Sequence, residues 1–276
     1  MSEGASGGSK RRNGSNRAAG AGAPIGEADR YFDRSRRPLE ILALLAPLIL
    51  FYEIGLLGAL RQQELVVTNR AHSTLLQFFH WVGIRGDHLL LPAMSLPALA
   101  VVAVLLAWQV LSRRPWSLHL PTVAAMAIES IATAIPVVLL GWLTALIPAT
   151  AGDSLIERLS VPGRISMAIG AGLYEEFVFR LMLVSLLHSL LKRLTPLGER
   201  GAVTLAVILA ALAFSLHHPV FRAEGFALHE ALFLFGAGCW WGVLLVVRGF
   251  GIAVGSHAAY DLWVVLPPLV TASAAS

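Results

Sequence analysis

Two glutamates and an arginine lie inside an apolar stretch of the sequence, AIGAGLYEEFVFRLMLVSLL. Ionisable side chains are costly in such surroundings, so they normally face other protein groups or a wet cavity. Arg180 follows Glu176 by four residues, the spacing at which side chains meet on a helix. The spacing therefore predicts that Arg180 pairs with Glu176 and keeps it ionised. Glu175 is then left for another task, and a buried carboxylate suits a general base that must also pass the proton on.

Two further pairs follow at the same spacing. Phe214 and His218 close an apolar stretch, and the helix is predicted to end near His218 because Pro219 cannot donate to the helix ladder. His257 and Asp261 lie in VGSHAAYDLWV, where an aspartate can fix the tautomer of a histidine one turn away or complete a polar pocket. A carboxylate and histidines in a pocket that water reaches can hydrolyse an amide. The carboxylate removes a proton from water, and a histidine holds the water or stabilises the oxyanion.

Two of the three pairs also have a purely structural interpretation. Glu176 with Arg180 is also what a buried ion pair between helices would look like, and His257 with Asp261 could be a satisfied hydrogen-bonded couple. Two adjacent glutamates are poorly balanced by one arginine, however, and three polar pairs on successive apolar stretches favour a shared site. Depth is a difficulty: in straight helices Glu175 lies near the midplane and His218 near the outer end of its span. To join them, either the segment that ends at His218 starts deeper or tilts strongly, or the loop after His218 re-enters the membrane.

The composition indicates which elements must position these residues. The chain has 276 residues, of which 56% are hydrophobic and 14% charged, and its mean hydropathy is +0.70. A soluble domain is about a quarter charged. The values exclude a soluble globular enzyme, a disordered chain and a coiled coil, and the single cysteine excludes a disulfide framework.

We therefore expect an all-α, polytopic transmembrane helical bundle of about seven spans, with six to eight as the range. A hydrocarbon core of about 30 Å requires ~20 apolar residues in a helix. Residues 72–84 are apolar but short, and are expected to form an interfacial or re-entrant helix. The candidate spans are residues 39–60, 88–111, 118–147, 164–192, 201–218, 228–247 and 251–270.

The net charge of +4 resides in residues 1–37, which carry eight basic and four acidic side chains. This tail is expected to be disordered, since its first 24 residues have almost no large apolar side chain. Its arginines next to the first span indicate a cytoplasmic flank. The basic loops near residues 113, 193 and 248 then fall on the same side. The sequence thus predicts a multi-pass protein of the cell inner (plasma) membrane with a cytoplasmic N-terminus, and no nucleic-acid partner.

At these motifs the chain resembles the CPBP family, the CAAX proteases and bacteriocin-processing (Abi) intramembrane proteases. The family pattern is EExxxR, then FxxxH, then HxxxN or HxxxD, on successive membrane helices. It stands here as EEFVFR at 175–180, FSLHH at 214–218 and HAAYD at 257–261. Each motif alone is weak, but the three in order are specific. The resemblance covers roughly residues 160–268.

The resemblance implies a glutamic intramembrane endopeptidase that needs no metal or other cofactor. Zinc is a minority alternative, because no HExxH motif is present. Some members have Asn where this chain has Asp261, and an anion there is a poorer oxyanion donor but supports His257 as a water-holding group. By analogy Glu175 activates the water, His218 helps to hold it, Glu176 and Arg180 organise the pocket, and His257 and Asp261 stabilise the tetrahedral intermediate.

We expect three regions: a basic tail at 1–37, an N-terminal transmembrane region at 38–117 and a protease core at 118–270. Glu53 and Glu129 fit helix packing better than the pocket, and His72 is expected to be interfacial. The expected partners are membrane lipid and a membrane-bound protein or peptide substrate. A non-catalytic immunity, scaffold or sorting factor is the alternative function. A proton-relaying transporter would require repeats with broken helices in both halves.

Overall fold

The computed structural model describes residues 27–61, 70–84, 95–145, 160–223 and 225–274. The expected disorder of the first 24 residues, and the start of the span expected at 88–111, lie outside these ranges. Within them the fold is all-α, as predicted, apart from one short hairpin. The helices are α1 (Glu27–Arg34), α2 (Pro38–Arg61), α3 (Arg70–Trp81), α4 (Leu96–Ser112), α5 (Leu120–Ala145), α6 (Val161–Glu175), the π-helix η3 (Glu176–Val184), α7 (Ser185–Leu194), α8 (Glu199–His217), α9 (Leu228–Val247) and α10 (Phe250–Ala274). The hairpin pairs β1 (Phe221–Arg222) with β2 (Gly225–Phe226).

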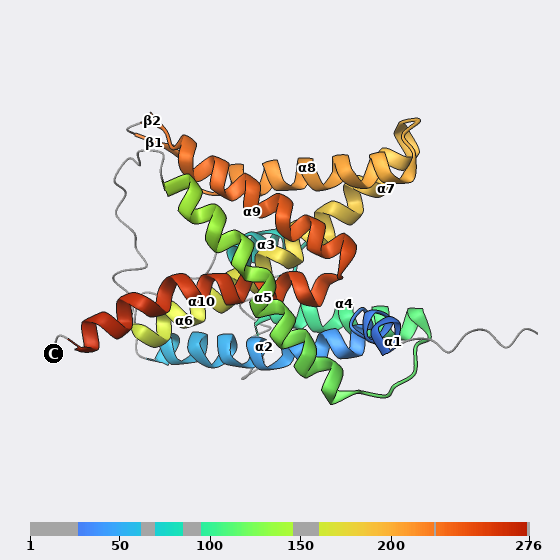
Figure 1. Cartoon of the computed structure of the whole chain (residues 1–276), viewed down its shortest axis with the longest axis horizontal. Helices are drawn as coiled ribbons and strands as arrows, with labels where there is room; N and C mark the ends of the chain where they lie inside the picture. Colours follow the sequence, from blue (N-terminus) through green and yellow to red (C-terminus); the bar gives the residue numbers. More distant parts are fainter. Residues whose placement is uncertain (1–26, 62–69, 85–94, 146–159, 224, 275–276) are drawn as a thin grey trace, which may run out of the picture.

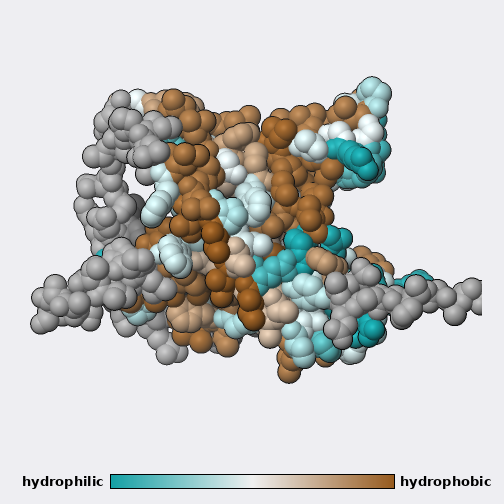
Figure 2. All heavy atoms as spheres, in the orientation of Figure 1, coloured by the Kyte–Doolittle hydropathy of each residue, from teal (hydrophilic) through white to brown (hydrophobic). Residues whose placement is uncertain are grey.

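The outer surface of the bundle matches a lipid environment. Four helices among the described residues, α2, α5, α8 and α9, are long and apolar enough to cross a membrane, and α4 is apolar but shorter. Helix α5 exposes Ile128, Ile131, Leu139 and Trp142, each by more than half. Figure 2 shows apolar residues over most of the visible face, with hydrophilic ones gathered at the right-hand end. The protein is therefore an all-α membrane protein.

Helix α10 lies at the centre of the bundle and packs against α5, α6 and α9 (Figure 1). Helix α6 also packs against α2. Glycines allow both approaches of α6: a Cβ at Gly170 would lie 2.2 Å from the ring of Tyr52, and one at Gly172 would lie 2.5 Å from the backbone nitrogen of Ala258. Since small residues let membrane helices approach closely, this pattern brings α6 and α10 within side-chain reach of each other.

Helices α6, η3 and α7 form one continuous rod that folds back on α8 as an antiparallel hairpin. Residues equally far from the turn of such a hairpin lie at the same level. Glu175 lies 19 residues before the last residue of α7, and His218 lies 19 residues after the first residue of α8. Glu175 and His218 therefore lie at the same depth, and the predicted difference between them is absent. The predicted difference arose because the depth of each residue was derived from its own straight span, 164–192 or 201–218. The hairpin sets the register of these two spans relative to each other.

The elements expected on the cytoplasmic side lie together at one end of the bundle. Helix α1, the end of α4 and the α7–α8 connection lie on the right in Figure 1, away from the C-terminus. Arg114, beyond α4, forms an ion pair with Asp33 of α1 at 3.1 Å, and Arg36 donates to the carbonyl oxygen of Val247 at the end of α9. This grouping is what the positive-inside interpretation requires of the helix order.

Candidate active site

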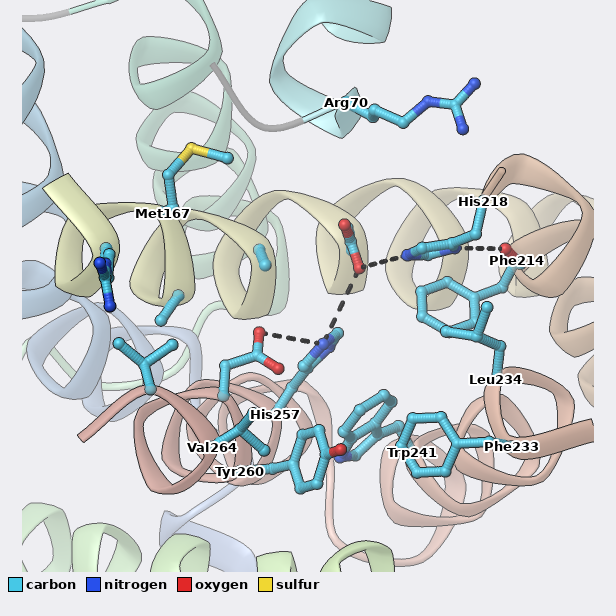
Figure 3. Close-up of a pocket in the computed structure, with 16 residues that line it drawn as sticks. Arg70, Met167, Phe214, His218, Phe233, Leu234, Trp241, His257, Tyr260 and Val264 are labelled. Carbon is cyan, nitrogen blue, oxygen red and sulfur yellow. Dashed lines mark hydrogen bonds and ion pairs between the residues drawn. The ribbon is translucent and has the colours of Figure 1, made fainter. Parts of the chain in front are cut away.

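The six residues singled out in the sequence meet around one place in the fold. Figure 3 shows His218 and His257 there. They come from three parts of the bundle: the end of α8, the junction of α6 and η3, and α10. Helix α8 ends at His217, and His218 is extended (φ −81°, ψ 160°), as the residue before a proline is biased to be. Glu175 ends α6, Glu176 and Arg180 belong to η3, and His257 and Asp261 lie on α10.

Glu175 lies between the two histidines. Its Oε2 atom is 3.8 Å from Nε2 of His218 and 3.8 Å from Nε2 of His257. The glutamate is buried, whereas the side chain of His218 is 22% exposed. Both distances exceed a direct hydrogen bond, and a separation of this size between polar atoms can be bridged by water. The three groups thus face one small volume from three directions.

The hydrogen bonds of the two rings define which nitrogen faces Glu175. Nδ1 of His218 lies 2.9 Å from the carbonyl oxygen of Phe214, which can only accept. Nδ1 of His257 lies 2.9 Å from Oε1 of Glu176. Each Nδ1 therefore carries a proton and donates it, so that each Nε2 is directed towards Glu175.

Glu176 joins two other members of the site. Its Oε2 lies 3.3 Å from Nε of Arg180, so the predicted pair is present, and its Oε1 accepts from Nδ1 of His257. Of the two roles open to Asp261, the structure agrees with completing a polar pocket, since Asp261 lines it with Oδ2 3.5 Å from Nε2 of His257. It is Glu176, from η3, that contacts Nδ1 of His257, and the spacing along one helix could not reveal this.

Two aromatic rings enclose the charged groups. The guanidinium carbon of Arg180 lies 4.2 Å from the centre of the Phe214 ring and 5.5 Å from that of Trp241. The indole of Trp241 stacks on the imidazole of His257, with 3.6 Å between ring centres and 12° between planes. Trp241 lies six residues before the end of α9 and His257 seven residues after the start of α10, so the turn between these helices brings them to the same level. The stack holds the imidazole plane, and cation–π contacts offset the burial of Arg180.

A pocket of about 300 Å³ opens beside these groups. Glu175, His218 and His257 line its walls. Figure 3 shows the two histidines there, with the ring of Tyr260 beside Trp241. Most of the other lining side chains are apolar, while Arg70 and Arg164 supply two basic ones. The lining residues are Arg70, Arg164, Met167, Ala168, Ala171, Glu175, Phe214, His218, Phe233, Leu234, Trp241, His257, Tyr260, Asp261, Val264 and Val265. A mostly apolar cavity with a few convergent polar groups is typical of a ligand or active site.

The π-helical turn of η3 is a local feature that the sequence did not predict. It begins at Glu176, directly after Glu175. A π turn contains more residues than an α turn, so consecutive side chains diverge less around the axis, and such turns occur often at functional sites. Both glutamates thus approach α10, where one reaches Nδ1 of His257 and the other faces its Nε2.

A buried polar cluster, formed mainly by residues of the N-terminal half, contacts the residue next to Glu175. Glu53 on α2 accepts hydrogen bonds from the backbone N–H and hydroxyl of Ser95, at 2.6 and 2.7 Å, and from the hydroxyl of Tyr174 at 3.2 Å. Tyr174 directly precedes Glu175. His72 packs edge-on against Tyr174 and is 2% exposed, so it belongs to this buried cluster. Glu53 lies outside the pocket lining and joins three helices, which agrees with the packing interpretation.

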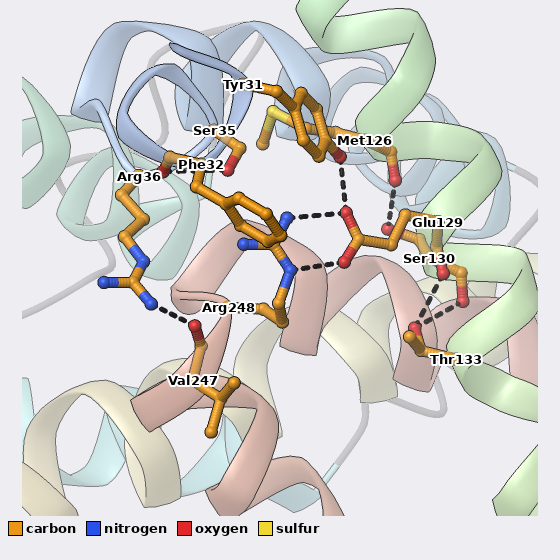
Figure 4. A network of polar contacts seen from close by, with 10 residues as sticks. All are labelled: Tyr31, Phe32, Ser35, Arg36, Met126, Glu129, Ser130, Thr133, Val247 and Arg248. Carbon is orange, nitrogen blue, oxygen red and sulfur yellow. Dashed lines mark hydrogen bonds and ion pairs between the residues drawn. The ribbon is translucent and has the colours of Figure 1, made fainter. Parts of the chain in front are cut away.

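Glu129 also joins helices rather than lining the pocket (Figure 4). On α5, it receives hydrogen bonds from Tyr31 of α1 and from Arg248 in the α9–α10 turn. The Arg248 guanidinium stacks on Phe32 at 4.2 Å. Among the residues that the structure describes, no group of three or more His, Cys, Asp or Glu side chains is arranged to hold a metal ion.

The fold and the site define an all-α membrane protein in which carboxylates and histidines converge on one pocket. Residues 157–263 match the family model described as Rce1-like, type II CAAX prenyl endopeptidase Rce1-like. The match covers the region that holds all three motifs, and it confirms the resemblance to the CPBP family there. This family is a protease family, and the match supports peptidase activity. Comparisons with the curated proteins and with the solved structures found no match.

Proposed function

We propose that the protein is a glutamic intramembrane endopeptidase, which hydrolyses a peptide bond of a membrane-associated protein or peptide. One observation carries the proposal. A single carboxylate oxygen, Oε2 of Glu175, lies 3.8 Å from two imidazole nitrogens on the wall of a largely apolar pocket. This is the arrangement that a water molecule needs if it is to be held by histidine and deprotonated by a carboxylate.

In the proposed reaction Glu175 takes one proton from water as the water oxygen attacks the carbonyl carbon of the substrate. The Nε2 atom of His218 accepts the second hydrogen of that water, since its Nδ1 is already engaged with the backbone. When the C–N bond breaks, Glu175 passes the proton to the leaving amine. The carboxylate is thereby restored, and the products are a carboxylic acid and an amine.

The oxyanion of the tetrahedral intermediate needs a hydrogen-bond donor. In its doubly protonated form His257 donates from Nδ1 to Glu176 and can donate from Nε2 to the oxyanion. Carboxylates of Glu175, Glu176 and Asp261 lie within 4 Å of this ring and stabilise the charged form by Coulombic attraction. In this proposal Arg180 balances Glu176, and Asp261 acts on His257 rather than on the substrate.

The lining of the pocket suggests the nature of the substrate. Apolar side chains dominate the walls, and helices that face lipid surround them. A peptide segment that is itself apolar, or held at the membrane by its own anchor, would enter such a pocket without desolvating many polar groups. The proposed partners are therefore membrane lipid and a membrane-bound protein or peptide.

The proposal is tested by comparing the protein N- and C-termini of source cells that carry wild type, Glu175→Gln or Glu199→Gln. Glu199→Gln is the matched control, because the same change falls on an exposed side chain at the start of α8. We expect one or more termini to disappear in the Glu175→Gln cells alone, with membrane levels of all three proteins equal. An unchanged set of termini would refute the protease assignment and favour the non-catalytic alternative.

A further inference from the structure

A second pocket, of about 310 Å³, opens between α1 and the start of α5, far from the candidate active site along the chain. In contrast to the first pocket it is lined largely by polar and basic groups. The lining residues are Arg30, Tyr31, Arg34, His119, Pro121 and Thr122. The proposed peptidase activity does not use it.

Two arginines provide positive charge on one wall. Arg30 and Arg34 are four residues apart on α1 and therefore share a face of that helix. None of the residues that line the pocket in the described part of the chain is acidic. Asp33, which is adjacent to Arg34 in sequence, is bound instead to Arg37 at 2.6 Å and to Arg114 at 3.1 Å.

His119, just before the start of α5, provides a hydrogen-bond donor to the lining. Its Nδ1 accepts from the backbone N–H of Thr122 at 3.3 Å and contacts the Thr122 hydroxyl at 2.9 Å. Since Nδ1 acts as an acceptor there, the proton of the neutral ring resides on Nε2, which is thus a donor. Two guanidinium groups and an imidazole N–H are the groups that proteins use to bind a phosphate.

The walls of this pocket are fixed to each other. Tyr31, which lines the pocket, donates its hydroxyl to Glu129 of α5, and Arg248 holds the same carboxylate at 2.7 Å (Figure 4). Arg36 donates to the carbonyl oxygen of Val247. Helix α1 is therefore docked on α5 and on the α9–α10 turn, and the pocket exists before any ligand arrives.

The position of the pocket matches the headgroup level of a bilayer. The candidate spans begin at Pro38 and Leu120, four residues after Arg34 and one residue after His119. Phe32 and Trp116, 45% and 64% exposed, lie in the same two segments, as aromatic side chains do at a membrane interface. Anionic headgroups attract basic residues at this depth.

We propose that this pocket binds a phosphate group, held by Arg30, Arg34 and the Nε2 atom of His119. The phosphate can belong to the headgroup of an anionic phospholipid or to a soluble phosphate anion. The proposal is independent of the peptidase assignment, because no residue of the candidate active site takes part.

The test measures binding to the full-length protein purified in a neutral detergent, from the shift of its thermal unfolding midpoint on titration. Phosphatidylglycerol, diacylglycerol with the same acyl chains, and inorganic phosphate are the three probes. The double variant Arg30→Gln/Arg34→Gln is compared with Arg193→Gln/Arg200→Gln, which removes the same charge from exposed sites at the α7–α8 connection. His119→Asn is a milder variant that keeps a capping acceptor and removes the Nε2 donor.

We expect the apparent Kd for phosphatidylglycerol to rise at least about tenfold in Arg30→Gln/Arg34→Gln, since the loss of even one charge-assisted hydrogen bond to the phosphate weakens binding by roughly this factor. His119→Asn should weaken binding less, and the control variant should match wild type. Equal protection by inorganic phosphate would identify a soluble anion as the ligand. Equal protection by diacylglycerol, or equal weakening in both double variants, would overturn the proposal.

Discussion

Gly172→Ala should displace His257 on α10 relative to Glu175 on α6 without altering any polar group. A Cβ at this position would lie 2.5 Å from the backbone nitrogen and 2.7 Å from Cα of Ala258, whereas ordinary contacts begin at 3.4 Å. The obstacle is backbone, so α6 and α10 must separate by about 1 Å to admit the methyl group. Ala258 follows His257, and the shift is therefore passed directly to the imidazole that faces Glu175.

A displacement of about 1 Å can lower an enzymatic rate by about 10²-fold, and overpacking destabilises by about 1–3 kcal/mol. We therefore expect substrate processing to fall about 100-fold while the protein stays folded at moderate temperature. The assay is the cleavage rate per folded protein in membranes, with the unfolding midpoint measured in parallel. Gly201→Ala is the control, because its Cβ would contact only the side chain of Leu197, at 3.5 Å. A folded Gly172→Ala protein with more than half the wild-type rate would refute the reasoning.

Three further outcomes follow from the contacts. In a denaturation assay, Arg180→Met should lower the free energy of unfolding by about 3–5 kcal/mol, because it leaves Glu176 charged and buried. Adding Glu176→Gln should restore part of this loss. Trp241→Phe should lower kcat more than KM in a cleavage assay, since the indole stacks on His257 at 3.6 Å; equal kcat would exclude a positioning role. Burial and a hydrogen bond to a carboxylate on α5 raise the pKa of Tyr31 to about 12. The neutral phenol therefore stabilises the fold fully below pH ~10 and loses this effect as pH rises through about 12. The difference in unfolding midpoint between wild type and Tyr31→Phe should shrink across that range. A constant difference would refute the shift in the pKa of Tyr31.

Local spacing was enough to predict the pairs within one helix. Four residues separate Glu176 from Arg180, and helical geometry alone brings them together. The end of α8 near His218 was predictable for the same reason, since a proline acts on its immediate neighbours. The helical fold followed from the length and apolarity of the spans.

Contacts between helices depend on register, which one sequence does not encode locally. The hydrogen bond from His257 to Glu176 requires the π turn and the close approach at Gly172. Trp241 lies in an apolar stretch whose pattern resembles any buried helix, so its stacking on His257 had no sequence signal. Even the level of Glu175 relative to His218 became clear only when the hairpin was seen as one unit.

The central claim is that Glu175 removes the proton from the attacking water. The most direct measurement is kcat for wild type, Glu175→Gln and Glu199→Gln, purified in lipid nanodiscs and given a peptide that spans a cleavage site found in cells. A general base contributes about 10²–10⁴-fold. We predict that kcat falls by at least about 100-fold in Glu175→Gln, with substrate binding retained and the Glu199→Gln rate equal to wild type. A Glu175→Gln rate within about threefold of wild type would contradict the mechanism.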